Sequence, residues 1–128
     1  MRDTTRLKRL RDLVASPSTD FDYVSTNYPS CGTSACFGGW ASWLAVNEDG
    51  YERHNTVYGC RVDGIYHMEF SAKWLGLTPG ETDALFFGDS LSEAGLESIC
   101  LSACSRKQAV ARLDTLIAWI EESSNVGA

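Results

Sequence analysis

The sequence predicts a mainly helical domain of the α+β class: five to six helices around one central apolar helix, with one short β-hairpin. Three observations lead to this prediction. Apolar residues recur at helical spacing in several segments, three segments begin with a helix-capping signature, and one Asp-Gly pair stands between β-forming residues. A chain of 128 residues is the usual size of a single domain with one hydrophobic core. We therefore interpret residues 1–128 as one domain.

The first predicted helix runs from Thr4 to Ser16. Its apolar side chains recur at helical spacing, whereas its basic side chains lie largely on the opposite face. The apolar positions are Leu7, Leu10, Leu13 and Val14. Asp3 or Thr4 can cap this helix, and Ser16-Pro17 ends it. Residues 18–30 have no helical period and are expected to be extended.

The central helix is predicted over Cys31 to Val46, the longest helical stretch without a charged residue. One of its faces carries only small side chains, which would let a neighbouring helix approach closely. The small residues are Ala35, Gly38, Ser42 and Ala45. Trp40 belongs to an adjacent stripe of large side chains and is expected in the core. Gly38 and Gly39 each cost a helix about 1 kcal/mol relative to alanine, so close packing is the reason we expect for both.

The one candidate for β-structure is a hairpin near residues 57–67. β-Forming residues flank the Asp63-Gly64 pair, which is typical of a hairpin turn. A lone hairpin is only marginally stable in water, so this one must pack on the helices. The chain is then expected to become helical from Met68 to Leu75, with Gly76 as the C-terminal cap.

Three further helices are predicted from the signatures at their starts. Thr78-Pro79-Gly80-Glu81 combines a capping box with proline at the first helical position. Ser90 with Glu93 repeats the capping pattern, and so does Ser105 with Gln108.

The last predicted helix, Arg106 to Glu122, is the most regular, and the tail Ser123 to Ala128 is expected to fray. Its core face carries Val110, Leu113, Ile117 and Ile120. Trp119 lies roughly 140° from the centre of that face, on the same side as Arg112. A tryptophan beside an arginine is typical of an interface hot spot, so we predict both as part of a contact surface. The alternative is that the hairpin or the first helix covers Trp119.

Charge is unevenly distributed along the chain, whose formal net charge is −6. The first twelve residues hold five of the eleven Lys and Arg residues. Between Pro79 and Ser105 there is no Lys or Arg, but there are five carboxylates. These are Glu81, Asp83, Asp89, Glu93 and Glu97. An excess of negative charge repels nucleic acid and attracts a basic partner, so we predict that these five carboxylates form a partner-binding surface. A solvated face without a partner is the alternative.

Five cysteines, an odd number, occur without an export signal or a membrane-spanning apolar run. These features indicate reduced thiols in the cytoplasm. Neither the pair Cys31 and Cys36 nor the pair Cys100 and Cys104 is expected in a knuckle-like turn, because Cys36 falls inside the predicted central helix and Cys104 at a helix end. We therefore expect small buried thiols, with no disulfide, no bound metal and no cofactor.

Two phrases of the sequence resemble a known pattern. The stretch from Cys31 to Ala41, CGTSACFGGWA, is similar to the CGTxxCxxGWA phrase of small uncharacterised proteins from bacteria and their phages. Leu75-Gly76-Leu77-Thr78, followed by Ala84-Leu85-Phe86, resembles the LGLT…A..LF phrase that often follows it. The resemblance covers roughly residues 31–87. It implies a small helical protein without an assigned activity, and it carries no catalytic residue across.

No nucleotide-binding or metalloprotease motif is present, so no catalytic residue is predicted and we expect no enzyme. We expect an acidic binding protein, encoded by a phage or mobile element, that acts in the cytoplasm of a bacterial host. It would dock on a host protein complex with a basic surface and inhibit it, as anti-CRISPR and other anti-defence proteins do. No direct contact with nucleic acid or membrane is expected, and a homodimer is left open.

Two alternative functions remain at this point. One is a phage structural or assembly protein that acts through self-association. The other is a cysteine-dependent enzyme in which His54 or His67 activates Cys31 at the start of a helix.

Overall fold

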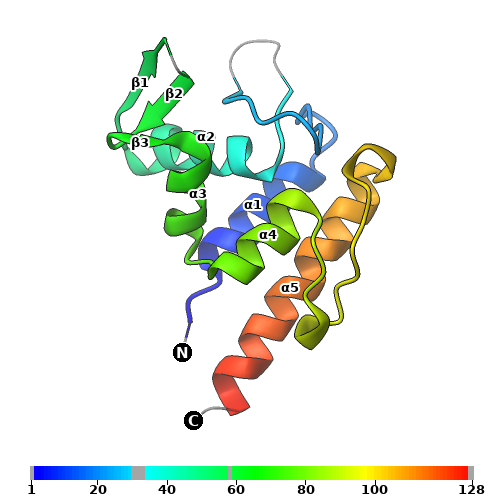
Figure 1. Ribbon diagram of the computed structural model, residues 1–128. Helices are drawn as coiled ribbons and strands as arrows, with labels where there is room; N and C mark the ends of the chain where they lie inside the picture. The colour runs from blue at the N-terminus through cyan, green and yellow to red at the C-terminus, as the bar shows by residue number, and fades with distance from the viewer. Residues whose placement is uncertain (1, 30–33, 58, 127–128) are drawn as a thin grey trace.

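The computed structural model describes residues 2–29, 34–57 and 59–126, and within them the chain forms five α-helices and one small sheet (Figure 1). The helices are α1 (Thr5–Ala15), α2 (Phe37–Asp49), α3 (His67–Leu75), α4 (Pro79–Phe87) and α5 (Arg106–Val126). The strands are β1 (Arg53–Thr56), β2 (Gly59–Val62) and β3 (Ile65–Tyr66), antiparallel in the order β1-β2-β3. The prediction of a mainly helical α+β chain is confirmed at this level.

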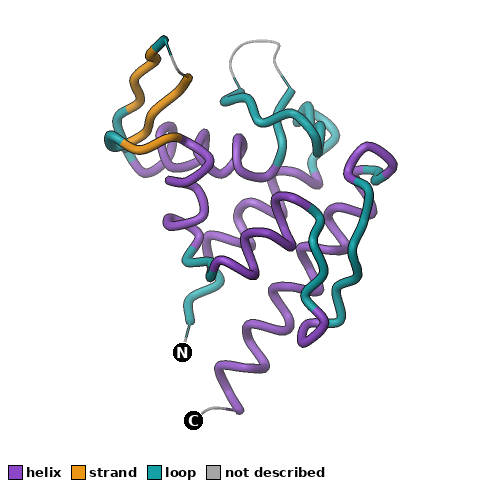
Figure 2. Tube along the Cα trace, in the orientation of Figure 1, coloured by secondary structure: helices purple, strands orange, loops and turns teal. Residues whose placement is uncertain are grey.

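The helices form one core, but they do not all surround α2. Helix α2 packs against α1, α3 and α4, whereas α5 packs mainly against α1 and α4. The sheet lies at one end of the molecule, and the connection between α4 and α5 runs along α5 on the other side (Figures 1 and 2). Among the most deeply buried side chains are Leu7, Leu10, Phe37, Leu85, Leu113, Leu116 and Ile120. The prediction of a single central helix is therefore not confirmed.

The start of α2 differs from the prediction. Ala35 forms a parallel bridge with Phe21, and the backbone N–H of Cys36 donates to the Ser25 carbonyl at 2.8 Å. These hydrogen bonds hold residues 34–36 extended, so the helix begins only at Phe37. Residues 31–33, which the prediction placed in the helix, lie outside the described residues.

The small side chains of α2 do permit close packing. A Cβ added at Gly38 would lie 2.5 Å from the Met68 sulfur, and one added at Gly39 would lie 2.2 Å from the Asn27 carbonyl oxygen. The hydroxyl of Ser42 lies 2.8 Å from the His67 carbonyl oxygen, where α3 begins. Trp40, expected in the core, is only half-buried and donates its indole N–H to the Asp20 carbonyl at 3.1 Å.

The predicted Asp63-Gly64 turn joins β2 to β3, and both residues adopt left-handed φ values of 53° and 78°. This conformation is that of a tight hairpin turn. Strand β1 was not predicted. It pairs along the whole of β2, from Arg53 opposite Val62 to Thr56 opposite Gly59. Its four residues are all exposed and do not alternate in burial, so no period-two pattern marks this strand in the sequence.

The helix boundaries with strong local signals follow the sequence closely. Gly76 caps α3 in the left-handed conformation, and Thr78 and Glu81 form the capping box of α4. At α5, the Ser105 N–H donates to the Gln108 side chain at 2.8 Å, and the Gln108 N–H donates back to the Ser105 hydroxyl at 3.2 Å. Helix α5 runs on to Val126, so residues 123–126, predicted to fray, are helical.

The helix predicted from Ser90 onward is absent from the described residues. The chain instead makes two short 3-10 turns, η1 (Ser92–Ala94) and η2 (Leu101–Ala103), with extended backbone between them. Gly95 is left-handed, with φ of 75°, and ends η1 after one turn. The backbones of Leu91 and Leu96 then bond to each other at 2.8 and 3.1 Å, which a continuous helix would not allow.

Candidate functional site

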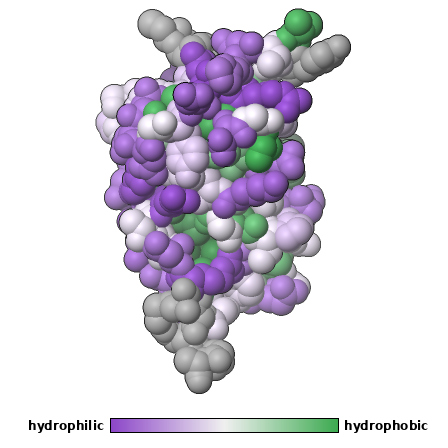
Figure 3. Space-filling model, turned by 90° about the vertical axis from the view of Figure 1, so that its left-hand side faces the viewer, coloured by the Kyte–Doolittle hydropathy of each residue, from purple (hydrophilic) through white to green (hydrophobic). Residues whose placement is uncertain are grey.

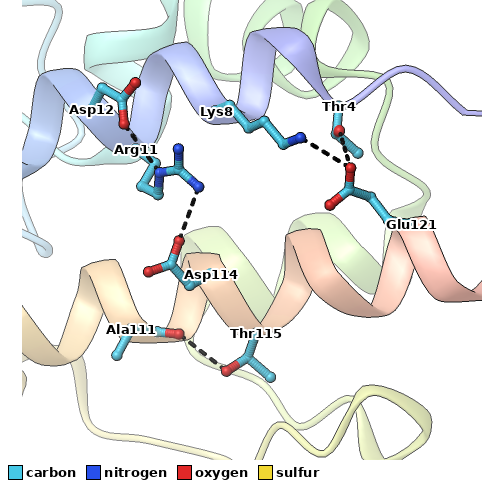
Figure 4. Close-up of polar contacts among 8 residues, drawn as sticks. All are labelled: Thr4, Lys8, Arg11, Asp12, Ala111, Asp114, Thr115 and Glu121. Atoms are coloured by element: carbon cyan, nitrogen blue, oxygen red, sulfur yellow. Dashed lines mark hydrogen bonds and ion pairs between the residues drawn. The ribbon is translucent and has the colours of Figure 1, made fainter.

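Three of the four positive charges of α1 form ion pairs within the molecule. Lys8 donates to Glu121 at 3.0 Å, and Arg11 lies 3.3 Å from Asp114, so two ion pairs connect α1 to α5 (Figure 4). The Thr4 hydroxyl also donates to Glu121, at 3.2 Å. These pairs flank the apolar contact between the two helices.

The other basic residues near the N-terminus are engaged as well. Arg9 contacts Asp49 at 3.1 Å, and Arg2 contacts Glu81 at 2.5 Å. Arg6 donates to the Trp74 carbonyl at 2.8 Å and stacks 4.8 Å from the Trp74 ring centre. The N-terminal cluster therefore offers little free positive charge to an outside partner.

Four of the five carboxylates of the acidic run face solvent. Asp83, Asp89, Glu93 and Glu97 are exposed, and none forms an ion pair with a residue that the structure describes. We call these four side chains the acidic surface. Asp83 lies on α4, and the other three lie on the α4–α5 connection, residues 88–105. At these four side chains, negative charge is not compensated by an ion pair with a described residue.

A buried arginine organises the backbone that carries the acidic surface. Arg112, 8% exposed, donates from Nε to the Ala84 carbonyl at 3.1 Å, and from its two terminal nitrogens to the carbonyls of Glu97 and Asp89 at 2.8 and 2.7 Å. It binds the carbonyls of two acidic residues and leaves their carboxylates free. The prediction that Arg112 belongs to an exposed contact surface is therefore corrected, because its side chain is buried.

Glu81 also departs from the prediction, because its side chain is buried at 2% exposure. Its carboxylate accepts hydrogen bonds from Arg2 and from the Thr78 backbone N–H, the latter at 2.9 Å. Burial acts to raise the pKa of Glu81, but the hydrogen bonds from Arg2 and Thr78 outweigh it, and the pKa lies below its usual value. Glu81 is a helix-capping residue and is not part of the acidic surface.

This pKa shift predicts how stability depends on pH. A carboxylate whose pKa is lowered by folding stabilises the fold above its unfolded pKa, and this stabilisation is lost as pH falls through the folded value. The free energy of unfolding should therefore fall more for the wild type than for Glu81→Gln between about pH 6 and about pH 3. Denaturant titrations at each pH measure this difference. Equal pH profiles for Glu81→Gln and the wild type would contradict the assignment.

Trp119 is half-buried and packs against the hydrophobic core. Trp119 lies on the side of α5 that also carries Gln108, Arg112 and Thr115. Part of this side faces the α4–α5 connection, whose turn η1 contacts α5 (Figure 1). Trp119 therefore remains only partly accessible to a partner.

Phe87 is an exposed aromatic residue that the sequence analysis did not single out. It is 53% exposed at the end of α4, two residues before Asp89. Helical periodicity alone could not distinguish it from the buried Phe86 beside it.

On the face of the molecule shown in Figure 3, hydrophobic residues are scattered among hydrophilic ones and form no continuous patch. An exposed aromatic side chain two residues before Asp89 is a candidate anchor for a partner.

A cavity of about 500 Å³ lies between the α4–α5 connection and α5. Its lining comprises Gly95, Leu96, Glu97, Ile99, Cys100, Ala103, Cys104, Gln108, Ala111, Arg112 and Thr115. Cys100 is exposed and Cys104 is half-buried, which corrects the prediction of buried thiols for this pair. Cys36 and Cys60 are buried as predicted, and all four described cysteines are free thiols. Cys31 lies outside the described residues.

The two histidines differ in their surroundings. His54 is exposed on β1, with Nε2 3.8 Å from Glu52. His67 is buried, and its ring nitrogens lie 2.7 Å from the Thr26 carbonyl oxygen and 3.3 Å from the Cys60 carbonyl oxygen. Both ring nitrogens of His67 therefore face backbone carbonyl oxygens.

Comparison with known proteins gives no relative: no family model, curated protein or solved structure matches this chain. Within the described residues, no three His, Cys, Asp or Glu side chains gather where they could hold a metal ion. The helices in the described ranges are all too short or too polar to cross a membrane.

Proposed function

We propose that the chain is a non-enzymatic binding protein that docks through its acidic surface on a basic surface of a host protein complex and inhibits that complex. The observation that carries the proposal is the contrast in charge between two parts of the molecule. Three of the four basic residues of α1 form ion pairs within the molecule, whereas Asp83, Asp89, Glu93 and Glu97 are exposed without an ion pair to any described residue. Free carboxylates of one sign steer and orient a basic partner.

The geometry also favours docking because the acidic surface is held in one arrangement before the partner arrives. Arg112 connects the carbonyls of Ala84, Asp89 and Glu97, and the Ile99 N–H donates to the Gly88 carbonyl at 2.9 Å. A preorganised surface loses less conformational entropy on binding. Inhibition of a nucleic-acid-binding defence complex, as by an anti-CRISPR protein of a phage or mobile element, is the specific form we propose, because carboxylates can occupy a channel built for phosphates.

Charge reversal in the acidic surface tests the proposal. The tagged protein is used to capture partners from a nuclease-treated host lysate, and the captured complex is then purified for rate measurements. The double variant Asp89→Lys/Glu93→Lys should bind this complex with a slower on-rate, and the wild-type on-rate should fall steeply with added salt. A control, Glu52→Lys/Glu69→Lys, makes the same charge change at two exposed positions near the sheet and on α3.

The experiment distinguishes a docking function of the acidic surface from a surface that is only solvated. A slower on-rate for the first variant alone supports docking through the acidic surface. Equal on-rates for both variants and the wild type, with no dependence on salt, would show that the acidic surface is only solvated.

A further inference from the structure

The cavity of about 500 Å³ lies between α5 and the α4–α5 connection, which runs along α5 (Figure 2). Its volume is within the range of about 300 to 1,000 Å³ that is typical of ligand sites. Solvent reaches it, because several of its lining residues are exposed: Cys100, Ala103, Gln108, Ala111 and Thr115. The cavity can therefore be entered without any movement of the core.

Both walls of the cavity carry apolar side chains. Leu96 and Ile99 come from the α4–α5 connection, and Ala111 comes from α5. Leu96 is buried, and Ile99 packs against the hydrophobic core. A ligand with an aliphatic part would remove that part from water between these two walls, which is favourable.

Charge decides which kind of aliphatic group fits. Glu97 lines the cavity, is exposed and has no ion pair with a described residue. Among the described lining residues Arg112 alone is basic, but its Nε and both terminal nitrogens donate to backbone carbonyls at 2.7 to 3.1 Å. Asp89 and Glu93 add negative charge on the same connection, and residues 79–105 contain no Lys or Arg. The cavity therefore favours a cation with an aliphatic stem over an anion.

The wall that the α4–α5 connection forms is held in place without a ligand. The Ile99 N–H donates to the Gly88 carbonyl at 2.9 Å, and the backbones of Leu91 and Leu96 bond to each other at 2.8 and 3.1 Å. A cavity that is already formed loses less conformational entropy when it is filled.

We propose that this cavity receives an arginine side chain of the basic partner, with the aliphatic stem between the apolar walls and the guanidinium near Glu97. An arginine buries its stem along apolar surface while its charged end stays near water. Arginine fits better than lysine, because a guanidinium is more weakly hydrated than an ammonium and arginine is enriched at interface cores where lysine is depleted.

The inference rests on the proposed docking function and divides it into two steps. Long-range attraction by exposed carboxylates acts mainly on the on-rate of a complex, whereas contacts made in a buried pocket act mainly on its off-rate. The acidic surface would thus guide the partner to the chain, and the cavity would retain it.

The first test uses the full chain, labelled with nitrogen-15, and the peptide acetyl-Gly-Gly-Arg-Gly-Gly-amide as the probe. Saturable shifts are expected at the amides of Ile99, Ala103 and Ala111 in NMR spectra. The same peptide with citrulline, the uncharged isostere of arginine, should cause none. Ala111→Leu fills the cavity and should abolish the shifts, whereas Ala118→Leu, at an exposed alanine of α5 outside the lining, should keep them. Equal shifts with the two peptides, or wild-type binding by Ala111→Leu, would overturn the proposal.

The second test uses the captured host complex and separates the cavity from the docking function. Ala111→Leu should raise the off-rate about tenfold at an unchanged on-rate, and Asp89→Lys/Glu93→Lys should lower the on-rate. A wild-type off-rate for Ala111→Leu, together with a slower on-rate for the double variant, would overturn the cavity proposal and leave docking intact. A wild-type on-rate for the double variant, together with saturable peptide binding, would overturn docking through the acidic surface and leave the cavity as an arginine site.

Discussion

Replacing Phe37 by alanine is expected to lower the free energy of unfolding by about 4 kcal/mol, within the range for buried aromatic side chains. Phe37 is fully buried at the start of α2, with its ring centre 5.0 Å from that of Phe21 and 5.3 Å from that of Tyr23. Truncation removes these contacts and leaves a cavity between α2 and the extended segment before it. Urea denaturation followed by circular dichroism measures the change.

Phe87→Ala is the matched control for this substitution. The same side chain is removed, but Phe87 is 53% exposed, so the free energy of unfolding should change by less than about 0.5 kcal/mol. Similar losses for the two variants would contradict the placement of Phe37 at the centre of the core. Phe87→Ala should instead weaken partner binding if Phe87 anchors the docking surface.

Replacing Arg112 by methionine is expected to lower the free energy of unfolding by about 3 kcal/mol. Methionine keeps much of the side-chain volume but cannot donate, so the carbonyls of Ala84, Asp89 and Glu97 lose their common donor. Hydrogen bonds to a charged donor contribute about 1.5 to 3 kcal/mol each, and partial solvation of the freed carbonyls offsets some of this loss. Urea denaturation measures the stability, and hydrogen exchange should show faster exchange at the Ile99 amide.

Lys107→Met is the matched control, because it removes a positive charge from an exposed position on the same helix. Its effect on stability should stay within about 0.5 kcal/mol. If Arg112→Met were as stable as Lys107→Met, the guanidinium would not be holding the α4–α5 connection. If Arg112→Met lost partner binding at a temperature where it remains folded, binding through the acidic surface would require the α4–α5 connection to be held by Arg112.

Elements with local signals could be predicted from the amino-acid sequence. Helix α1 is found within one residue of its predicted ends, the Asp63-Gly64 turn joins two strands, and the capping boxes at Thr78 and Ser105 open α4 and α5. Each of these features depends on side chains and backbone groups within a few residues of one another. Local hydrogen bonding and the apolar period were therefore enough to predict them.

The segment after Ser90 shows where a local signal fails. Ser90 and Glu93 have the spacing of a capping box, yet the chain makes only a single 3-10 turn there. The competing interactions come from elsewhere: the Asp89 and Glu97 carbonyls bond to Arg112 on α5. Carbonyl groups that accept hydrogen bonds from the Arg112 guanidinium do not need helical hydrogen bonds. The sequence does not reveal that Arg112, on a distant helix, is their donor.

Which charged and thiol groups are accessible depends on tertiary packing and could not be predicted from the sequence. Glu81 and Asp83 are alike in the sequence, but Glu81 is buried against Arg2 from the far end of the chain, whereas Asp83 faces solvent. Arg112 is a charged residue that the fold buries, and Cys100 and Cys104 of one short segment both line a single cavity. The physical reason is that burial and pairing depend on residues distant in sequence, whereas helix capping and turn formation depend on neighbours.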